Sequence, residues 1–381
     1  MNWPPQFPES TLAFSFLIAL GVILIIQLCY FLFIYLKPGL KKSGENQIVS
    51  NSELPPVSVI VCAKNEEKNL LALIPLILDQ DYPEFQLVIV NDNSWDDTSD
   101  ILKAFQVSHP NLHVTNLDED KQRMQGKKFA LTLGIKAAKY ERILLTDADC
   151  RPVSNNWIKS MMSNASNRDI VIGYSPYRHK NGFSNSFIRF DSHFGALNYT
   201  GMALAKMPYM GVGRNLSYDS SLFFKVGGFR SHMNIVSGDD DLFINQVANK
   251  SNTATVIFPE SHMISEPKTT LNDWYKQKRR HLCTAPHYKA FHKILLSIFP
   301  LTYYLMWVLA GVLLVLHTHP LLVIGPIVLR YLVQFFIFRL SSRNLGNPDL
   351  SYKAWYLELF WMLVMPVVSM SITFRKPNAW S

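Results

Sequence analysis

The chain is poor in cysteine and in charge. Four cysteines occur among 381 residues, and none of them share the short spacing that a zinc site or a disulfide framework needs. This excludes a fold held together by zinc or by disulfides, and it is consistent with a reduced domain that faces the cytosol. Charged residues make up 17% of the chain and hydrophobic residues 48%. That balance is too apolar for an ordinary soluble protein and too polar for one that lies entirely within a membrane.

Long apolar stretches are what the chain has instead. Residues 12–36 are long enough to cross a bilayer, which takes about 20 apolar residues in a helix. No basic residue precedes them and they show no small-residue cleavage pattern, so they are predicted to be an uncleaved anchor and not a secretory signal. Residues 294–316 and 321–338 are predicted to cross the membrane as well, because they are long and free of acidic side chains.

A fourth stretch, residues 354–374, is interrupted by Glu358 and Pro366. It could cross the membrane, lie at its surface or re-enter on the same side. Arg375 and Lys376 favour a cytoplasmic end for this stretch, whereas a fourth full crossing would put that end outside. The sequence leaves these alternatives open.

Basic residues gather beside the first three stretches, and all fall on one side of the membrane if the central region is cytoplasmic. They are Lys37, Lys41, Lys42, Lys276, Lys278, Arg279, Arg280, Lys289, Lys293, Arg339 and Arg343. The net charge of +8 is therefore largely membrane-flanking. No basic helix is interleaved with aromatic residues, so no nucleic acid is expected as a partner. We predict an integral protein of a bacterial-type inner membrane, in contact with the lipid bilayer, with its central region in the cytoplasm.

The central region alternates strand patterns with helix patterns. Strands are predicted at residues 57–63, 85–92, 112–118 and 142–149, and helices at residues 66–79, 97–105 and 127–140. Short connections between them predict an α/β fold with a mainly parallel sheet and right-handed crossovers. Ligands bind beyond the carboxyl ends of the strands in such sheets, which is where Asn91, Asp92, Asp147 and Asp149 fall.

Two aspartates one residue apart end the strand at 142–149. Repulsion and desolvation both oppose placing two like charges there, so we expect a cation beside Asp147 and Asp149. Carboxylate oxygens suit Mg²⁺ or Mn²⁺, which are often held by one or two carboxylates together with substrate phosphates. A helix cap at Asp149 is the plainer alternative, but it would leave Asp147 unexplained.

Three further motifs accompany this pair in a fixed order. They are "CAKNEEKNL" (62–70), "VNDNSWDDT" (90–98) and "QGKKFAL" (125–131). Together with "TDADC" (146–150) they resemble, in order and spacing, the nucleotide-sugar half of the family 2 glycosyltransferases, which have a GT-A fold. The resemblance runs from about Val57 to Leu282.

The resemblance implies roles for the residues of these motifs. Asp92 would accept hydrogen bonds from the nucleotide base, and Asn65 and Glu66 would lie against the base or ribose. Lys127, at a helix start, would offset pyrophosphate charge. Each residue also has a plain alternative: Asp92 could be a turn residue, and Glu66 and Lys127 could be solvated helix charges.

For the paired aspartates, the resemblance implies that Asp149 binds a divalent metal, Mg²⁺ or Mn²⁺. Asp147 would share that metal or hold the nucleotide or ribose side. His262, just after a strand, lies where some GT-A enzymes have a metal-binding histidine, but a lone histidine is more often structural.

Two later segments resemble the acceptor side of the same family. In "MGVGRN" (210–215), Gly213 would let the backbone approach a sugar and Asn215 would contact it, although a glycine-rich edge loop would look the same. In "WYKQKRRHL" (274–282), the residues at the family's Gln-x-x-Arg-Trp positions are Gln277, Arg280 and His281. Histidine stands where tryptophan is usual, and the segment also fits a basic helix on the membrane surface.

Three consecutive aspartates in "SGDDDLFINQ" (237–246) open a helix pattern. The family usually has Glu-Asp here, with the aspartate as general base. Aligning the following Asp241 and Leu242 places the base at Asp239. Gly238 then replaces the usual glutamate, which leaves Asp239 and Asp240 both open as catalytic residues.

The resemblance and the apolar stretches together divide the chain into eight parts. They are a tail (1–11), a membrane helix (12–36), a linker (37–54), a GT-A domain (55–268), an interfacial segment (269–293), two membrane helices (294–316 and 321–338) and a crossing or re-entrant segment (354–374).

The expected activity is a metal-dependent, inverting transfer of sugar from a nucleotide-sugar donor, with a UDP-sugar the more frequent choice, to a hydroxyl of a lipid-linked or membrane-associated glycan. A processive polysaccharide synthase is one alternative. A membrane-anchored nucleotide-binding protein without turnover is another.

Overall fold

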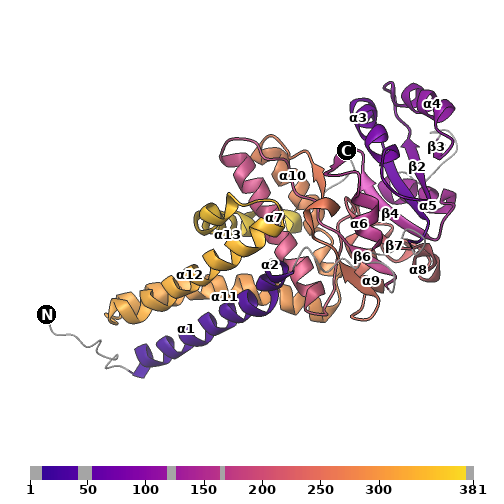
Figure 1. The fold of residues 1–381 in the computed structure, drawn as a ribbon. Helices are drawn as coiled ribbons and strands as arrows, with labels where there is room; N and C mark the ends of the chain where they lie inside the picture. Colours follow the sequence, from indigo (N-terminus) through magenta and orange to yellow (C-terminus); the bar gives the residue numbers. More distant parts are fainter. Residues whose placement is uncertain (1–10, 42–53, 118–125, 164–167, 375–381) are drawn as a thin grey trace.

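The structure, a computed structural model, describes residues 11–41, 54–117, 126–163 and 168–374. The predicted tail up to Ser10, most of the predicted linker, and Arg375 and Lys376 lie outside the described residues. A sheet covered by helices forms one end of the molecule, and long helices run away from it to form the other end (Figure 1).

The main sheet has seven strands in the order β3-β2-β1-β4-β7-β6-β8. The strands are β1 (Val57–Ala63), β2 (Phe85–Asp92), β3 (Leu112–Leu117), β4 (Arg142–Asp147), β6 (Ile170–Ile172), β7 (Leu216–Asp219) and β8 (Thr253–Thr255). β7 runs antiparallel to both of its neighbours, and the other pairs are parallel. The prediction of an α/β fold with a mainly parallel sheet is therefore confirmed.

Helices cover the sheet because its strands are apolar on both faces. In β1, six of the seven residues are buried, as expected for a central parallel strand. The covering helices are α3 (Glu67–Leu78), α4 (Thr98–Ser108), α5 (Lys127–Ala137) and α6 (Trp157–Met162). Two short strands, β5 (Cys150–Pro152) and β9 (Met263–Ser265), pair beside them.

Strand register brings the sequence motifs to one edge of the sheet. Ala63 at the end of β1 pairs with Asn91 of β2, and Cys62 pairs with Asp147 of β4. Leu216 opens β7 and pairs with Leu145 near the end of β4. The loops after β1, β2 and β4 and the loop before β7 consequently meet at the same edge.

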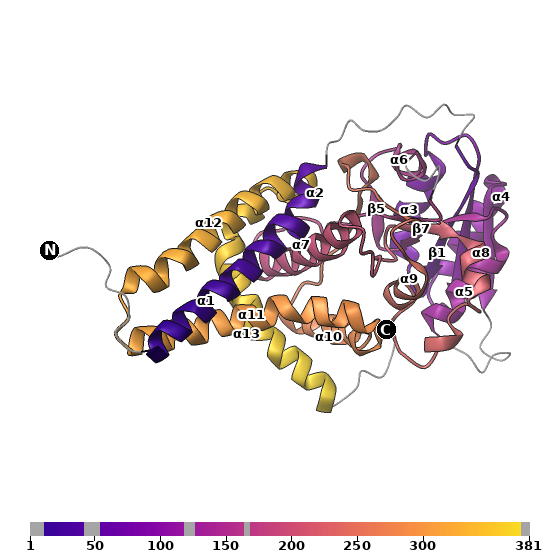
Figure 2. The ribbon, with the colours of Figure 1, turned by 90° about the horizontal axis from the view of Figure 1, so that it is seen from below.

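Four helical stretches are long and apolar enough to cross a membrane. The first joins α1 (Thr11–Tyr30), a π turn (Phe31–Tyr35) and α2 (Leu36–Leu40), and the others are α11 (Ala290–Val315), α12 (Pro320–Asn344) and α13 (Leu350–Phe374). α1, α11 and α12 run side by side, whereas α13 points in another direction (Figures 1 and 2). α13 continues through Pro366 as one helix.

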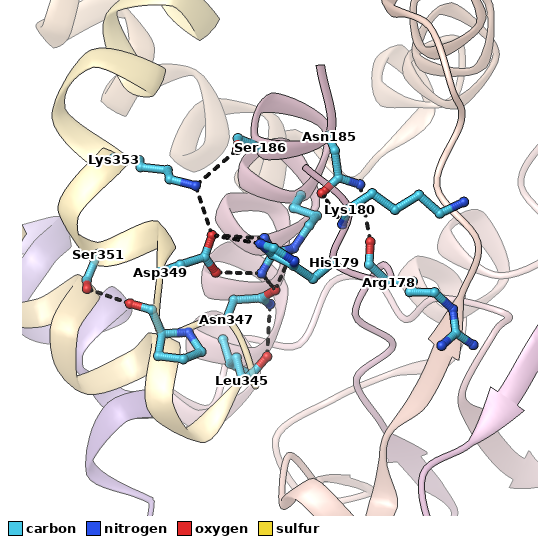
Figure 3. Close-up of polar contacts among 12 residues, drawn as sticks. Arg178, His179, Lys180, Asn185, Ser186, Leu345, Asn347, Asp349, Ser351 and Lys353 are labelled. Atoms are coloured by element: carbon cyan, nitrogen blue, oxygen red, sulfur yellow. Dashed lines mark hydrogen bonds and ion pairs between the residues drawn. The ribbon is translucent and has the colours of Figure 1, made fainter. Parts of the chain in front are cut away.

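Helix α7 (Phe183–Leu204) lies between the sheet and the long helices (Figure 2). Its buried Arg189 donates two hydrogen bonds to Asp349, at 3.0 and 2.7 Å, in the loop between α12 and α13. Figure 3 shows Asn347 and Asp349 of that loop pointing toward α7, with Lys353 reaching Ser186 at 3.2 Å. Polar contacts thus fasten the α12–α13 loop to the sheet-bearing part of the chain.

Helices α8 (Ser220–Lys225), α9 (Asp241–Val247) and α10 (Leu271–Leu282) complete the fold. α10 carries the predicted interfacial motif, and it is attached to α7 through Asp191. The carboxylate of Asp191 accepts hydrogen bonds from Trp274 at 3.0 Å and from Lys278 at 2.6 Å, both on α10. It also accepts one from Trp361 of α13 at 2.7 Å, so one buried side chain joins three helices.

Candidate active site at the carboxyl edge of the sheet

Lys127 connects the two halves of the site. It opens α5 directly after Gly126, which has a φ of 112°, a conformation that glycine tolerates best. Its Nζ lies 2.8 Å from Oδ1 of Asp147 at the end of β4 and 3.3 Å from Oδ2 of Asp239 before α9. One ammonium group therefore bridges the predicted donor side and the predicted catalytic side.

The three consecutive aspartates have different surroundings. Asp240 caps α9: its carboxylate accepts the backbone N–H of Asp241 at 2.7 Å and that of Gly213 at 2.8 Å. Asp241 accepts hydrogen bonds from Thr284, Tyr288 and its neighbour Leu242. Among the described residues, Asp239 is thus the member of the trio whose carboxylate pairs with Lys127.

Burial and neighbouring charges shift the pKa values of Asp239 and Asp240 in opposite directions. Burial opposes ionisation of Asp239, but the Lys127 ammonium outweighs it and holds the pKa of Asp239 below its usual value. Burial, followed by the Asp239 and Asp241 carboxylates, raises the pKa of Asp240 to about 7. At neutral pH Asp239 is therefore ionised, whereas Asp240 is close to its midpoint.

Asp149 lies one residue beyond β4, beside Asp147. Burial first, and then repulsion from Asp147, raises the pKa of Asp149, while Arg214 opposes that rise. A divalent cation would relieve this repulsion, and two carboxylates are a donor set that Mg²⁺ and Mn²⁺ accept. No group of three or more His, Cys, Asp or Glu side chains gathers as a metal site within the described part of the chain. The pair therefore fits a metal whose remaining ligands come from a bound substrate.

The predicted nucleotide-binding residues surround the ends of β1 and β2. Asp92 is buried, and its Oδ2 has no hydrogen-bond partner among the described residues. Burial raises the pKa of Asp92. Asn65 has a φ of 56° and accepts the backbone N–H of Trp95 at 3.0 Å, which joins the loop after β1 to the loop after β2. Glu66 accepts a hydrogen bond from Asn69 at 2.6 Å.

The predicted acceptor residues divide into two groups. Gly213 lies at the site, where its N–H holds Asp240. Asn215 is fully buried, and its amide bonds to Tyr174, Ser261 and Trp157. All of these contacts lie within the chain, so Asn215 helps to hold the loop at residues 210–215 in place. We do not propose Asn215 as a residue that contacts the acceptor.

On α10, the positions of Gln277, Arg280 and His281 share one face, because residues three and four apart are neighbours on a helix. Gln277 lies close enough to Tyr177 to lower its pKa, against the larger rise that burial causes, and the Tyr177 ring lies 4.5 Å from the Arg214 guanidinium. His281 lies within electrostatic reach of Arg214. The structure therefore brings α10 to the Arg214 side of the site.

Arg214 is a residue that the sequence analysis did not single out. It precedes β7, lies close enough to Asp147 and Asp149 to interact electrostatically, and its Nη1 has no hydrogen-bond partner among the described residues. An arginine between Gly213 and Asn215 gives no sequence signal of its own. Its proximity to the paired aspartates follows only from the antiparallel pairing of β7 with β4.

His262 is placed as a structural residue. It is buried, its Nε2 lies 3.0 Å from the carbonyl oxygen of Ile257, and its ring packs edge-on against Tyr174. Gly346 of the α12–α13 loop lies on the Nδ1 side of the ring. The histidine therefore packs between β-sheet loops and the helical part, and we assign it no metal.

The family match and the sequence similarity to known proteins agree with an active site at this edge of the sheet. Residues 58–230 match the family described as Glycosyl transferase family 2. Glycosyltransferase AglE of Haloferax volcanii is 29% identical over 199 residues, 50% of this chain and 60% of that protein. A poly-beta-1,6-N-acetyl-D-glucosamine synthase of Staphylococcus epidermidis is 32% identical over 135 residues, 35% of this chain and 30% of that protein. The chain therefore spans only part of the length of either curated relative.

Among solved structures, the mannosyltransferase PcManGT from Pyrobaculum calidifontis, in complex with GDP-Man and Mn²⁺, superimposes with a TM-score of 0.57. The match covers 96% of this chain and 99% of that one, at 18% identity. At this identity the similarity shows a shared fold, a GT-A-like sheet with long apolar helices on both sides of it in the sequence. The family match and the ordered motifs agree that residues 58–230 of this chain are similar to glycosyltransferase family 2.

Proposed function

We propose that the protein is a membrane-anchored, inverting glycosyltransferase. It moves a sugar from a nucleotide-sugar donor to a hydroxyl of a lipid-linked or membrane-associated glycan, with the help of a divalent metal. The observation that carries this proposal is the position of Lys127, within 2.8 Å of Asp147 and 3.3 Å of Asp239. A donor diphosphate held on the Asp147 side would leave its sugar next to the Asp239 carboxylate.

On the donor side, the Oδ2 of buried Asp92 has no partner within the described part of the chain and is suited to accept a hydrogen bond from a nucleotide base. Lys127 and Arg214 would place positive charge beside the diphosphate. Asp149 and Asp147 would hold a divalent metal, which when bound neutralises diphosphate charge and makes it a better leaving group. The orientation of the donor therefore rests on five side chains from four segments at one edge of the sheet.

On the catalytic side, Asp239 acts as general base. It takes the proton from the acceptor hydroxyl while the hydroxyl oxygen forms a bond to the anomeric carbon. The bond between that carbon and the diphosphate oxygen breaks on the opposite face, so the anomeric configuration inverts. Lys127 supports this role because it keeps Asp239 ionised at neutral pH.

Several observations favour a membrane-associated acceptor. Four helices are of membrane-spanning length and hydropathy, and α10, with Gln277, Arg280 and His281, is fastened by Asp191 to α7 and α13. The acceptor end of the site is thus built from elements joined to the long helices. The length of the product, resolved on a gel, separates single transfer from processive polymerisation.

The metal proposal predicts that Asp149→Ala removes the dependence of donor binding on Mn²⁺. Because the variant lacks one of two carboxylate ligands, we expect its nucleotide affinity in Mn²⁺ to fall by about 10–100-fold. Binding of UDP and GDP is measured by calorimetry with and without Mn²⁺, which also identifies the base. Asp100→Asn, at an exposed acid on α4, is the control and should behave as wild type. Full Mn²⁺ dependence in Asp149→Ala would rule out this ligand assignment.

Asp240 provides a prediction for the pH profile. Since its pKa is raised to about 7 by burial and by the neighbouring acids, Asp240 is protonated in weak acid and ionised in weak base. Its ionisation adds a negative charge beside Asp239 and makes Asp239 a stronger base, so kcat should rise as pH increases through about 7. The profile of Asp240→Asn should lose this step, whereas a step of unchanged size in the variant would contradict the assignment.

A further inference from the structure

A groove opens on the helical part of the molecule, where the first long helical stretch meets the end of α7 and the start of α11. Its volume is about 590 Å³, and its walls are mainly apolar, with Tyr30, Phe33 and Leu295 among them. Of the residues that line it, Lys37 and Lys206 carry charge. These two lysines come from segments far apart in the sequence, so the fold brings two positive charges to one apolar groove.

Along the first long helical stretch, apolar residues of the groove are followed by a lysine. A membrane lipid has the same order, a hydrocarbon chain followed by a charged headgroup. Tyr30 lies within the apolar run, and Lys37 follows at its end, about 10 Å further along the helix axis. The structure gives neither lysine an acidic partner within the described ranges, which omit residues 42–53 among others. An anionic headgroup at the level of the membrane surface would supply that missing charge.

Two uncommon backbone conformations occur beside the groove, a π turn and a lysine with a positive φ. Phe33 belongs to the π turn, a feature that is frequent at functional sites. Gly201 of α7 packs against that turn so closely that a Cβ there would lie 2.5 Å from the carbonyl oxygen of Ile34. Lys206 has a φ of 66°, at a helix end where glycine is usual. A side chain with a Cβ is disfavoured in this conformation, so the lysine at this position is consistent with a use for its side chain.

We propose that this groove binds an anionic lipid, with the hydrocarbon chain along Tyr30, Phe33 and Leu295 and the phosphate between Lys37 and Lys206. The inference deepens the proposed function and rests on it, because the bound lipid would be the phosphate-bearing anchor of the acceptor. The groove is joined along the chain to the candidate active site. Met207 lines the groove, and the same loop continues to Gly213, whose N–H holds Asp240.

Binding of dodecyl phosphate to the full chain tests this proposal. The protein is released from neutral maltoside micelles and examined by native mass spectrometry. Lys37→Gln/Lys206→Gln should weaken binding by about tenfold or more, because two charge-assisted contacts are lost. The matched control Lys103→Gln/Lys250→Gln removes the same charge from exposed sites on the sheet-bearing part and should bind like wild type. Cys29→Phe places a larger side chain in the apolar part of the groove and keeps both lysines. It should also weaken the binding of dodecyl phosphate, because less room is left for the hydrocarbon chain.

Three outcomes would overturn the proposal. They are unchanged binding in Lys37→Gln/Lys206→Gln, equally tight binding of uncharged dodecanol, and displacement of dodecyl phosphate by an equal concentration of inorganic phosphate. Calorimetric binding of the donor nucleotide to every variant shows whether it is folded. Release of nucleotide from the donor by the wild-type protein is measured separately. Its absence would contradict the proposed glycosyltransferase function without bearing on lipid binding in the groove.

Discussion

Asp239→Asn should lower kcat for sugar transfer by about 10²–10⁴-fold, the range that general acid–base catalysis contributes. The amide cannot take the proton from an acceptor hydroxyl. It can still accept a hydrogen bond from Lys127, so Lys127 should stay beside the donor diphosphate and the affinity for donor nucleotide should be retained. The measurement pairs initial rates of transfer with calorimetric binding of the nucleotide.

Asp240→Asn and Asp100→Asn serve as comparisons for this variant. Asp240 already accepts two backbone N–H groups, so its amide variant should lose much less transfer activity than Asp239→Asn. Asp100 is exposed on α4 and should show no loss. If Asp239→Asn transfers sugar at the wild-type rate while Asp240→Asn does not, the base is Asp240 and the present assignment is wrong.

Glu358→Gln should destabilise the protein by about 3–5 kcal/mol, the usual cost of leaving a buried charge without its partner. Arg330 of α12 and Glu358 of α13 form a bidentate pair at 2.7 and 2.8 Å, and both side chains are fully buried. Arg330 also contacts Gln27 of α1 at 3.2 Å. The pair thus joins three of the four membrane-length helices, and unfolding of the purified protein in SDS measures its contribution.

The double variant Arg330→Met/Glu358→Leu is the control for this prediction. It removes both charges and replaces them with apolar side chains, which are often tolerated as well as a buried pair. It should recover most of the stability lost in Glu358→Gln. A change of less than about 0.5 kcal/mol in Glu358→Gln, the level of an ordinary surface substitution, would show that the pair does not hold the helices together.

The strands of the sheet could be predicted because their signals are local. β1 and β2 begin and end where the apolar runs at 57–63 and 85–92 do, since strands buried on both faces need continuous apolar sequence. Parallel order then places their carboxyl ends, and with them Asp92, Asp147 and Asp149, at one edge. Most of the donor side of the site therefore follows from pattern and topology.

Helix α7 could not be predicted in this way. Its buried face contains Arg189, Asp191 and His193, which interrupt the apolar spacing expected of a core helix. Their burial is possible because partners arrive from distant segments, such as Asp349 for Arg189 and Trp274 for Asp191. A single sequence does not reveal such pairings.

The ends of the long helices also depend on contacts that a single sequence does not reveal. The apolar stretch at 321–338 ends before Arg339, but α12 continues to Asn344. Ser341 and Ser342 are buried there, and Gly39 of α2 packs against the backbone of Ser341. Glu358, which interrupted the last apolar stretch, belongs to one continuous helix because Arg330 neutralises its charge. Hydropathy cannot anticipate either contact.

Anomalous diffraction at the manganese edge, from crystals of the full chain grown with Mn²⁺ and the diphosphate nucleotide that binds, tests the central proposal most directly. We expect one manganese peak between the Asp149 carboxylate and the diphosphate, with Lys127 and Asp239 on the side where the sugar is attached. A nucleotide bound away from the ends of β1 and β4, or manganese bound away from Asp147 and Asp149, would contradict the account.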